Sequence, residues 1–210
     1  MYTPRPFAFS ADQSDAVRRI MDENPFAAMV IPSAAGLETV HIPFLLDPTR
    51  GDHGTLRAHV ARANPIWQHF GDDPALVIFW GPHAYVSPDW YVSEGLVPTW
   101  NYVAVHAQGV PSIVDKLDEV EALLADLSAA SEESLAPKPP WTMDRVPADQ
   151  RTALMRGIVA FEIPITHLEA KQKLSQNRTP DDIAGVAAGL RQTGGDANTT
   201  VAALMEKAAR

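Results

Sequence analysis

The sequence predicts a mainly β protein with added helices, organised as one barrel. Its 210 residues suit one large or two small domains, and β-rich chains of this length often form a single unit. Eighteen prolines and twelve glycines indicate many loops and edge strands rather than a long helical bundle. A hydrophobic fraction of 46% with 20% charged residues gives enough apolar material for a buried core.

The N-terminal third reads as a helix followed by a hairpin and a third strand. Ser10 and Gln13 resemble a capping box, and the helical spacing behind them predicts a helix that ends near Asn24. Apolar, β-branched runs at 26–31 and 39–45 flank the turn-forming stretch 33–36, which predicts a hairpin. A further strand is expected over 55–60.

The middle of the chain alternates short helices with long apolar strands. Asn64 and Pro65 supply the N-cap and first position of a short helix that runs to Phe70. Strands are expected at 75–80, continued by 84–86, and within 101–114. From Asp115 onward, leucine and valine recur at helical spacing with acidic residues opposite, which predicts a helix packed outside the barrel.

The C-terminal third is expected to hold one more strand and then helices only. The proline-rich stretch 136–141 is a loop, and 158–165 reads as the last strand. Thr166 with Glu169 forms a second candidate capping box. The run 179–182, Thr-Pro-Asp-Asp, starts a helix that Gly194 and Gly195 end, and a last helix covers 199–209. We expect a barrel domain over 1–178 and a helical extension over 179–210.

Composition excludes several kinds of protein. The chain has no cysteine, which rules out disulfides and thiolate zinc sites and fits a reducing compartment. Neither a signal-peptide pattern nor an apolar run of about 20 residues occurs, so a cytoplasmic location is expected. The net charge of −9 opposes non-specific DNA binding, because Lys and Arg supply most of that affinity.

The run RAHVARANP is a candidate phosphate site. Arg57, His59 and Arg62 precede a helix start that Asn64 caps, and free amides at a helix start combine well with guanidinium and imidazole groups around a phosphate. The alternative is that the arginines are solvated and Asn64 only caps a helix.

Two further segments carry candidate binding groups. The rings of Trp90, Tyr91, Trp100 and Tyr102 surround a proline-rich loop and would suit a flat heteroaromatic ligand, with Asn101 as a hydrogen-bonding partner, although stacked rings are more often core. The segment 171–178, KQKLSQNR, could clamp a phosphate or a ribityl chain. Its alternative is a polar helix end whose cations complement the helix dipole.

Other chemistries find little support in the sequence. Histidines at 41, 59, 83 and 106 lie on separate expected strands without HxH or HxxxH spacing, so no metal site is expected. No GxSxG elbow, GxGxxG loop or GxxxxGK[ST] loop is present, which argues against a hydrolase elbow and against Rossmann or P-loop nucleotide sites.

Six blocks of the chain resemble the PaiB-type family of FMN-binding negative transcriptional regulators. They occur in the family order from Met1 to Arg178 and read MYTPRPF, HIPFLL (from His41), HVARANP, GPHAYVSPDWY, VPTWNY and KLSQNR. The resemblance implies a six-stranded FMN-binding split barrel that pairs into a homodimer with FMN in grooves at the interface. RAHVARANP also looks like the phosphate segment of pyridoxamine-phosphate oxidases, which leaves open whether Arg57, His59 or Arg62 meets the phosphate.

The residues and the resemblance together give a set of candidate cofactor contacts. These are His41, Arg57, His59, Arg62, Asn64, Trp100, Asn101, Lys173, Ser175, Gln176, Asn177 and Arg178. No catalytic residue is predicted.

Three functions remain open from the sequence. The resemblance implies a flavin-linked repressor, acting on DNA directly or through partners, although the charge and the lack of a basic recognition helix argue against direct binding. The alternative is an oxidoreductase in which FMN and a nicotinamide or another small molecule react. A haem protein using His41, His83 or His106 is the third.

Overall fold

The computed structural model describes residues 1–9, 14–71 and 73–209. The expected cap formed by Ser10 and Gln13 lies outside these residues. The described strands are β1 (Phe26–Ser33), β2 (Gly36–Pro43), β3 (Leu45–Asp47), β4 (Thr55–Ala61), β5 (Ala75–Val86), β6 (Thr99–Gly109), β7 (Ser112–Val114), β8 (Ile158–Pro164) and β9 (His167–Lys173). The α-helices are α1 (Ser14–Glu23), α2 (Leu117–Glu133), α3 (Ala148–Arg156), α4 (Pro180–Thr193) and α5 (Asp196–Ala208), with short 3-10 helices at Arg5–Phe7, Pro65–His69 (η3), Pro88–Trp90 and Met143–Arg145.

The strands form two sheets, and the chain is mainly β with added helices, as predicted. One sheet has the order β2-β1-β5-β6-β9 and the other the order β3-β4-β8-β7. The expected count of six strands is not confirmed, because the described residues contain nine. Several of the extra strands, such as β3 and β7, span only three residues, too short for a hydrophobic period to reveal them.

By its contacts, the chain divides into two compact units. The first unit comprises 1–23, 80–105 and 169–210, and the second comprises 24–79 and 106–168. The C-terminal helices, expected as an extension, thus belong to a unit that also holds strand residues.

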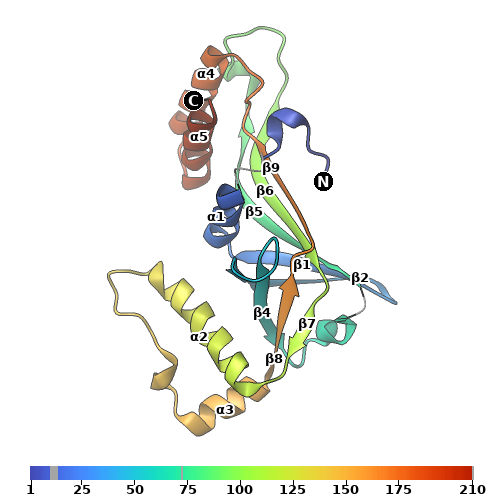
Figure 1. Cartoon of the computed structure of the whole chain (residues 1–210). Helices are drawn as coiled ribbons and strands as arrows, with labels where there is room; N and C mark the ends of the chain where they lie inside the picture. The colour runs from blue at the N-terminus through green and yellow to red at the C-terminus, as the bar shows by residue number, and fades with distance from the viewer. Residues whose placement is uncertain (10–13, 72, 210) are drawn as a thin grey trace. The chain divides into compact units, whose positions relative to one another are not determined.

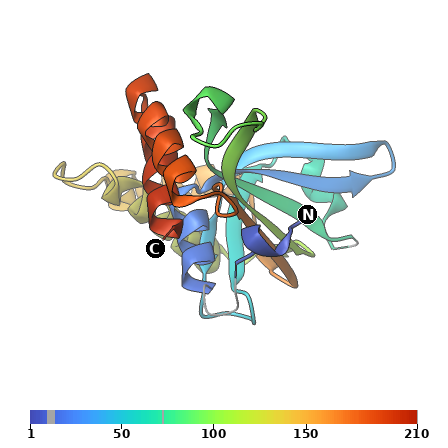
Figure 2. The same cartoon turned by 90° about the horizontal axis from the view of Figure 1, so that it is seen from above.

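The predicted hairpin is confirmed in the second unit. β1 and β2 pair antiparallel from Phe26 opposite Pro43 to Ser33 opposite Gly36, and Figure 2 shows them as the two long blue strands. Gly36 has a φ of +125°, a backbone conformation that residues other than glycine rarely adopt. The two-residue turn formed by Ala34 and Ala35, with this glycine directly after it, therefore fixes the register.

The predicted helix after residue 166 is wrong. His167–Lys173 forms β9, which lies beside β6 in the five-stranded sheet. The Thr166 hydroxyl, expected to cap a helix, instead donates to the Gln108 carbonyl oxygen. Pairing with a neighbouring strand satisfies the backbone groups of this polar segment. A local capping motif contains no information about a strand so far away in the sequence.

Each unit has its own helix-covered apolar cluster. In the first, α4 and α5 lie side by side (the red helices of Figure 1) and bury Val186, Leu190 and Met205 against strand residues such as Val103. In the second, Leu123 and Leu127 of α2 pack with Met155 of α3 and Ala160 of β8. The helix predicted from Asp115 onward is thus confirmed, with α3 added beside it.

Candidate functional site

The run RAHVARANP lies on β4 and the turn that follows it, in the second unit. Leu56, Ala58 and Val60 are buried on one face of the strand. Since side chains alternate along a strand, Arg57 and His59 share the opposite face. β4 pairs antiparallel with β8, where Glu162 stands opposite Arg57. The sequence prediction of this strand is confirmed.

Arg57 is already paired with carboxylates. Its Nη1 lies 2.7 Å from Asp126 Oδ2 of α2, and its Nε lies 3.8 Å from Glu162 Oε1. Glu162 also accepts two hydrogen bonds of 2.6 Å from Arg50, and these bonds hold the pKa of Glu162 below its ordinary value. A phosphate at Arg57 would have to compete with two anions.

Arg62 has a different environment from Arg57. Its Nε donates to the Arg156 carbonyl oxygen at 2.8 Å, and its Nη2 donates to the Ile158 carbonyl oxygen at 2.7 Å. No carboxylate among the described residues forms an ion pair with Arg62. The guanidinium is therefore oriented by neutral acceptors, is exposed and keeps its charge available.

Asn64 caps the helix that the sequence predicts. Its Oδ1 accepts a hydrogen bond of 3.0 Å from the Ile66 amide, and Pro65 follows at the first helical position. The element is a 3-10 helix, η3, and not an α-helix. The indole of Trp67 donates to the Arg62 carbonyl oxygen at 3.1 Å, which ties η3 back to the turn.

His59 carries a buried ring nitrogen with no hydrogen-bond partner among the described residues. The atom is Nδ1, and burial lowers the pKa of this histidine. The imidazole is therefore favoured in its neutral form, as a hydrogen-bonding group and not as a cation. Buried polar atoms are nearly always satisfied, so an orphaned one calls for an explanation. His41, the remaining candidate of this unit, is an exposed residue of β2 opposite Ala28.

In the first unit, the blocks VPTWNY and KLSQNR are joined by a buried polar contact. Asn101 is 0% exposed, and its Nδ2 donates to Ser175 Oγ at 3.1 Å, while the Ser175 hydroxyl donates to Asn101 Oδ1 at 3.2 Å. Asn101 Nδ2 also lies 3.2 Å from Met205 Sδ of α5. Ser175 has a φ of +63°, an unusual conformation that its buried bonds support.

The remaining side chains of KLSQNR are also largely engaged within the first unit. Lys173 donates to the Thr99 hydroxyl. Gln176 accepts from the Leu174 amide at 2.8 Å and donates to the Gln172 carbonyl oxygen at 2.7 Å. The Arg178 guanidinium lies 5.6 Å from the ring centroid of Tyr91. Asn177 is the exposed member of the run.

The expected wall of Trp90, Tyr91, Trp100 and Tyr102 does not form as one surface. Trp90 and Tyr91 pack against the α4–α5 cluster, whereas Trp100 is 54% exposed. Trp100 instead lies 6.3 Å from His83 and 5.9 Å from Tyr85, and His83 lies 6.3 Å from Trp80, between ring centroids. We call Trp80, His83, Tyr85 and Trp100 the exposed ring face.

Sequence reasoning missed this face because the alternation along β5 is interrupted. Buried residues alternate regularly up to Gly81 and again from Ala84, but Pro82 and His83 in succession are not buried. One extra residue of this kind is typical of a bulge, where proline is tolerated. The shift in the apolar–polar alternation between the two halves of β5 was the sequence signal that could have predicted this face.

Asp182 is a second residue whose role the sequence did not reveal. It is 1% exposed, and its Oδ1 accepts from the amides of Val92 and Ser93 at 2.9 and 2.8 Å. The Ser93 hydroxyl donates to Oδ2 at 2.8 Å. These bonds, above all that from the Ser93 amide, lower the pKa of Asp182 to about 2. The helix start predicted at Thr179 thus also anchors a loop.

The described residues contain neither a metal-binding cluster nor a membrane-spanning helix. Among residues 1–9, 14–71 and 73–209, no group of three or more histidines and carboxylates is placed to hold a metal ion. Within the same ranges, every helix is too short or too polar to cross a bilayer.

Comparison with known families and curated proteins gave strong matches. A family model described as "Putative FMN-binding domain" matches residues 1–167. The protease synthase and sporulation protein PAI 2 of Bacillus subtilis is 32% identical over 207 residues, which cover 98% of this chain and 97% of that protein. An uncharacterised protein of Emericella nidulans is 31% identical and covers 93% of each chain.

Solved structures match at much lower identity. The flavocytochrome Anf3 from Azotobacter vinelandii has a TM-score of 0.58 at 14% identity, covering 87% of this chain and 78% of that one. The FAD and heme binding protein from Mycobacterium smegmatis has a TM-score of 0.57 at 15% identity, covering 86% and 80%. At such identities the matches show the fold alone, which is split-barrel-like as the sequence predicts.

Proposed function

This chain belongs to the FMN-binding domain family, and from that premise we propose that it is a flavin-linked regulatory protein that holds the FMN phosphate with the run HVARANP. The family match over residues 1–167 carries the proposal. It also confirms the flavin cofactor that the sequence predicts. The regulatory role is supported by the name of the Bacillus subtilis relative, which calls it a protease synthase and sporulation protein.

The second unit has groups that fit a phosphate. Arg62 is oriented by two carbonyl oxygens and has no anionic partner among the described residues, so an incoming phosphate would add a charge-assisted bond without displacing another. The orphaned Nδ1 of His59 lies in the same run. Of the candidates that the sequence left open, these observations favour Arg62 over Arg57, whose charge two carboxylates already balance.

The exposed ring face supports the proposal of a homodimer. Three of its members, Trp80, Tyr85 and Trp100, are 59%, 46% and 54% exposed. Clusters of exposed aromatic residues are more frequent in protein–protein interfaces than on the rest of a protein surface. We assign the face to a second copy of the chain, and Trp100 also remains the candidate for stacking on a flavin ring.

Regulation through a partner protein is favoured over direct readout of DNA. The net charge is −9. In the described part of α4 and α5, Arg191 is paired with Glu206. Lys207 is then the remaining cation of these two helices, which is too little positive charge to bind the DNA backbone. The protein would then transmit the binding or redox state of FMN to a partner protein, and it would not insert a helix into a groove of DNA.

An oxidoreductase is the second candidate. Bound FMN supplies hydride and single-electron transfer itself, so the protein needs no nucleophile of its own. Fold relatives named as flavocytochrome and FAD-binding proteins are consistent with this reading.

The test begins with the visible absorption spectrum of the protein, as isolated and during titration with FMN. We expect a flavin spectrum and saturable quenching of FMN fluorescence. A Soret band without flavin, or neither quenching nor a thermal shift with FMN, would overturn the cofactor assignment. Steady oxidation of NADH or NADPH by the loaded protein would favour the enzyme, and a salt-sensitive gel shift on its own upstream DNA would favour direct repression.

A further inference from the structure

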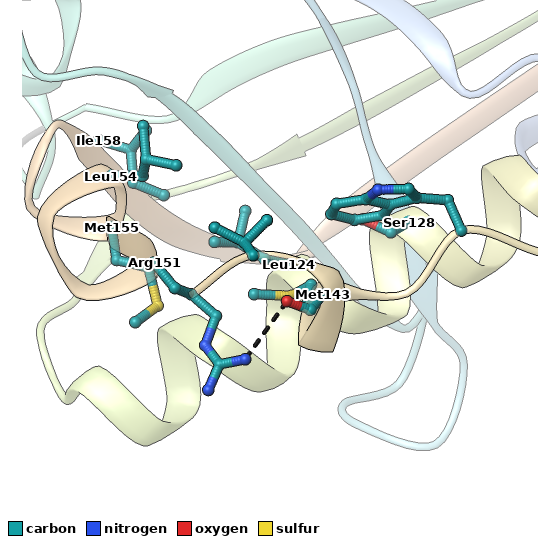
Figure 3. A pocket seen from close by; sticks show the side chains of 9 residues that line it. Leu124, Ser128, Met143, Arg151, Leu154, Met155 and Ile158 are labelled. Atoms are coloured by element: carbon teal, nitrogen blue, oxygen red, sulfur yellow. Dashed lines mark hydrogen bonds between the residues drawn. The ribbon is translucent and has the colours of Figure 1, made fainter. Parts of the chain in front are cut away.

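An apolar pocket lies in the second unit, and one of its lining residues, Ile158, accepts a hydrogen bond from Arg62 through its carbonyl oxygen. It has a volume of about 280 Å³ and lies between α2, α3 and the segment that joins them. Figure 3 shows the side chains that line it. The lining residues are Leu124, Ser128, Trp141, Met143, Val146, Arg151, Leu154, Met155 and Ile158.

The walls of the pocket are built almost entirely from hydrocarbon and thioether groups. Met143 and Met155 approach from two different elements, and methionine adapts its shape to a guest more readily than branched side chains do. This pocket beside the Leu123–Leu127 cluster is partly open to solvent, and a concave, mainly apolar surface of this kind is typical of small-molecule sites.

Among the described lining residues, Ser128 and Arg151 have polar side chains, beside the indole of Trp141, and the charge of Arg151 is already compensated. Arg151 Nε lies 3.0 Å from Glu121 Oε1, and its Nη1 donates to the Met143 carbonyl oxygen at 3.3 Å, the dashed line of Figure 3. Ser128 contributes a hydroxyl from α2. The pocket thus offers single hydrogen bonds but no unbalanced charge.

We propose that this pocket binds a small uncharged molecule with an apolar body and one hydrogen-bonding group. An enclosed apolar cavity of about 150 Å³ takes up benzene, so a partly open pocket of about 280 Å³ has room for an apolar body of about eight carbons. The single polar group meets Ser128 or the free side of Arg151. Neither Arg62 nor His59 lines this pocket, so a ligand in it would be distinct from the phosphate of the proposed function and goes beyond that function.

Charge decides the ligand class. A carboxylate entering the pocket would lose its hydration without gaining an unpaired cation, because Glu121 already balances Arg151. An alcohol with the same chain loses much less. The matched pair 1-octanol and octanoate therefore separates an uncharged-ligand pocket from an anion site.

The two methionines provide a local readout. In protein carrying ¹³C-methyl methionine, titration with 1-octanol is expected to shift the Met143 and Met155 signals saturably, with a Kd of about 1 mM or tighter. The signals of Met21, Met29 and Met205, buried elsewhere, should not move. Octanoate at neutral pH is expected to bind at least about tenfold more weakly.

A blocking variant completes the test. Leu154 lines the pocket but is 59% exposed, so Leu154→Arg should fold and should abolish the octanol shifts. Leu117→Arg, at an exposed leucine outside the pocket lining, is the matched control and should leave them unchanged. Saturation in Leu154→Arg, unsaturable shifts in the native protein, or tighter binding of octanoate would each overturn the proposal.

Discussion

Two blocks that both hold candidate phosphate-binding groups, HVARANP in the second unit and KLSQNR in the first, differ in how many of their polar atoms lack a partner within the protein. In KLSQNR, the side chains of Ser175, Gln176 and Lys173 already bond within their own unit. In HVARANP, the guanidinium of Arg62 keeps an unbalanced charge, and the Nδ1 of His59 has no partner among the described residues. We therefore propose HVARANP as the ligand-binding block because of these unused bonding groups, and we interpret KLSQNR as a structural contact.

The largest expected effect is on the structural side of this comparison. Asn101→Ala removes a fully buried amide and leaves the Ser175 hydroxyl without its partner. We expect a loss of about 3 kcal/mol in the free energy of unfolding, from the lost bond and the space left behind. Chemical denaturation measures it.

A double-mutant cycle with Ser175→Ala serves as the control for Asn101→Ala. The two losses should be less than additive because the residues share bonds. Additive losses in the free energy of unfolding would show that Asn101 and Ser175 do not stabilise the fold through a shared contact.

The second effect tests the close packing of the Trp90 ring against Gly189 of α4. A Cβ on Gly189 would lie 2.4 Å from the Trp90 ring, too close for any real contact. Gly189→Ala is therefore expected to destabilise by about 2 kcal/mol, despite the better helix propensity of alanine. Thermal unfolding measures it. Ala188→Leu, at the exposed neighbouring position, should change little, and equal behaviour of the two variants would contradict the account.

Arg57→Ala gives a smaller effect, of structural origin. It removes the ion pair that joins β4 to Asp126 of α2, a pair with one partly buried member, and should cost about 1 kcal/mol. Its effect on FMN affinity, measured by fluorescence quenching, should stay within about threefold. A loss of tenfold or more for FMN with riboflavin unaffected would move the phosphate from Arg62 to Arg57.

The smallest effect concerns acid stability. Because hydrogen bonds lower the pKa of Asp182 to about 2 in the folded protein, its contribution to stability is complete above the unfolded pKa near 4. It is lost as the pH falls from about 4 to 2. The difference in melting temperature between native protein and Asp182→Asn should therefore be constant above about pH 5 and shrink towards pH 2. A difference independent of pH over this range would remove Asp182 as the anchor of the Ser93 loop.

Local patterns predicted the elements that local chemistry determines. The hairpin around Gly36, the cap at Asn64 and the helix start at Thr179 are all confirmed. β9 escaped prediction because its pairing with β6 involves residues far away in the sequence. For the same reason, the sequence could not show that Asp126 balances Arg57 or that Asn101 bonds Ser175.

The most direct test of the central claim is the ratio of FMN affinity to riboflavin affinity in Arg62→Ala, measured beside Lys173→Ala. Riboflavin lacks only the phosphate, so the ratio isolates the contacts to that group. For Arg62→Ala we predict that FMN binding weakens by about 2 kcal/mol, roughly 30-fold, with riboflavin unchanged. For Lys173→Ala, whose ammonium is held by Thr99, we predict an unchanged ratio. An unchanged ratio in Arg62→Ala, or a fall confined to Lys173→Ala, would contradict the account.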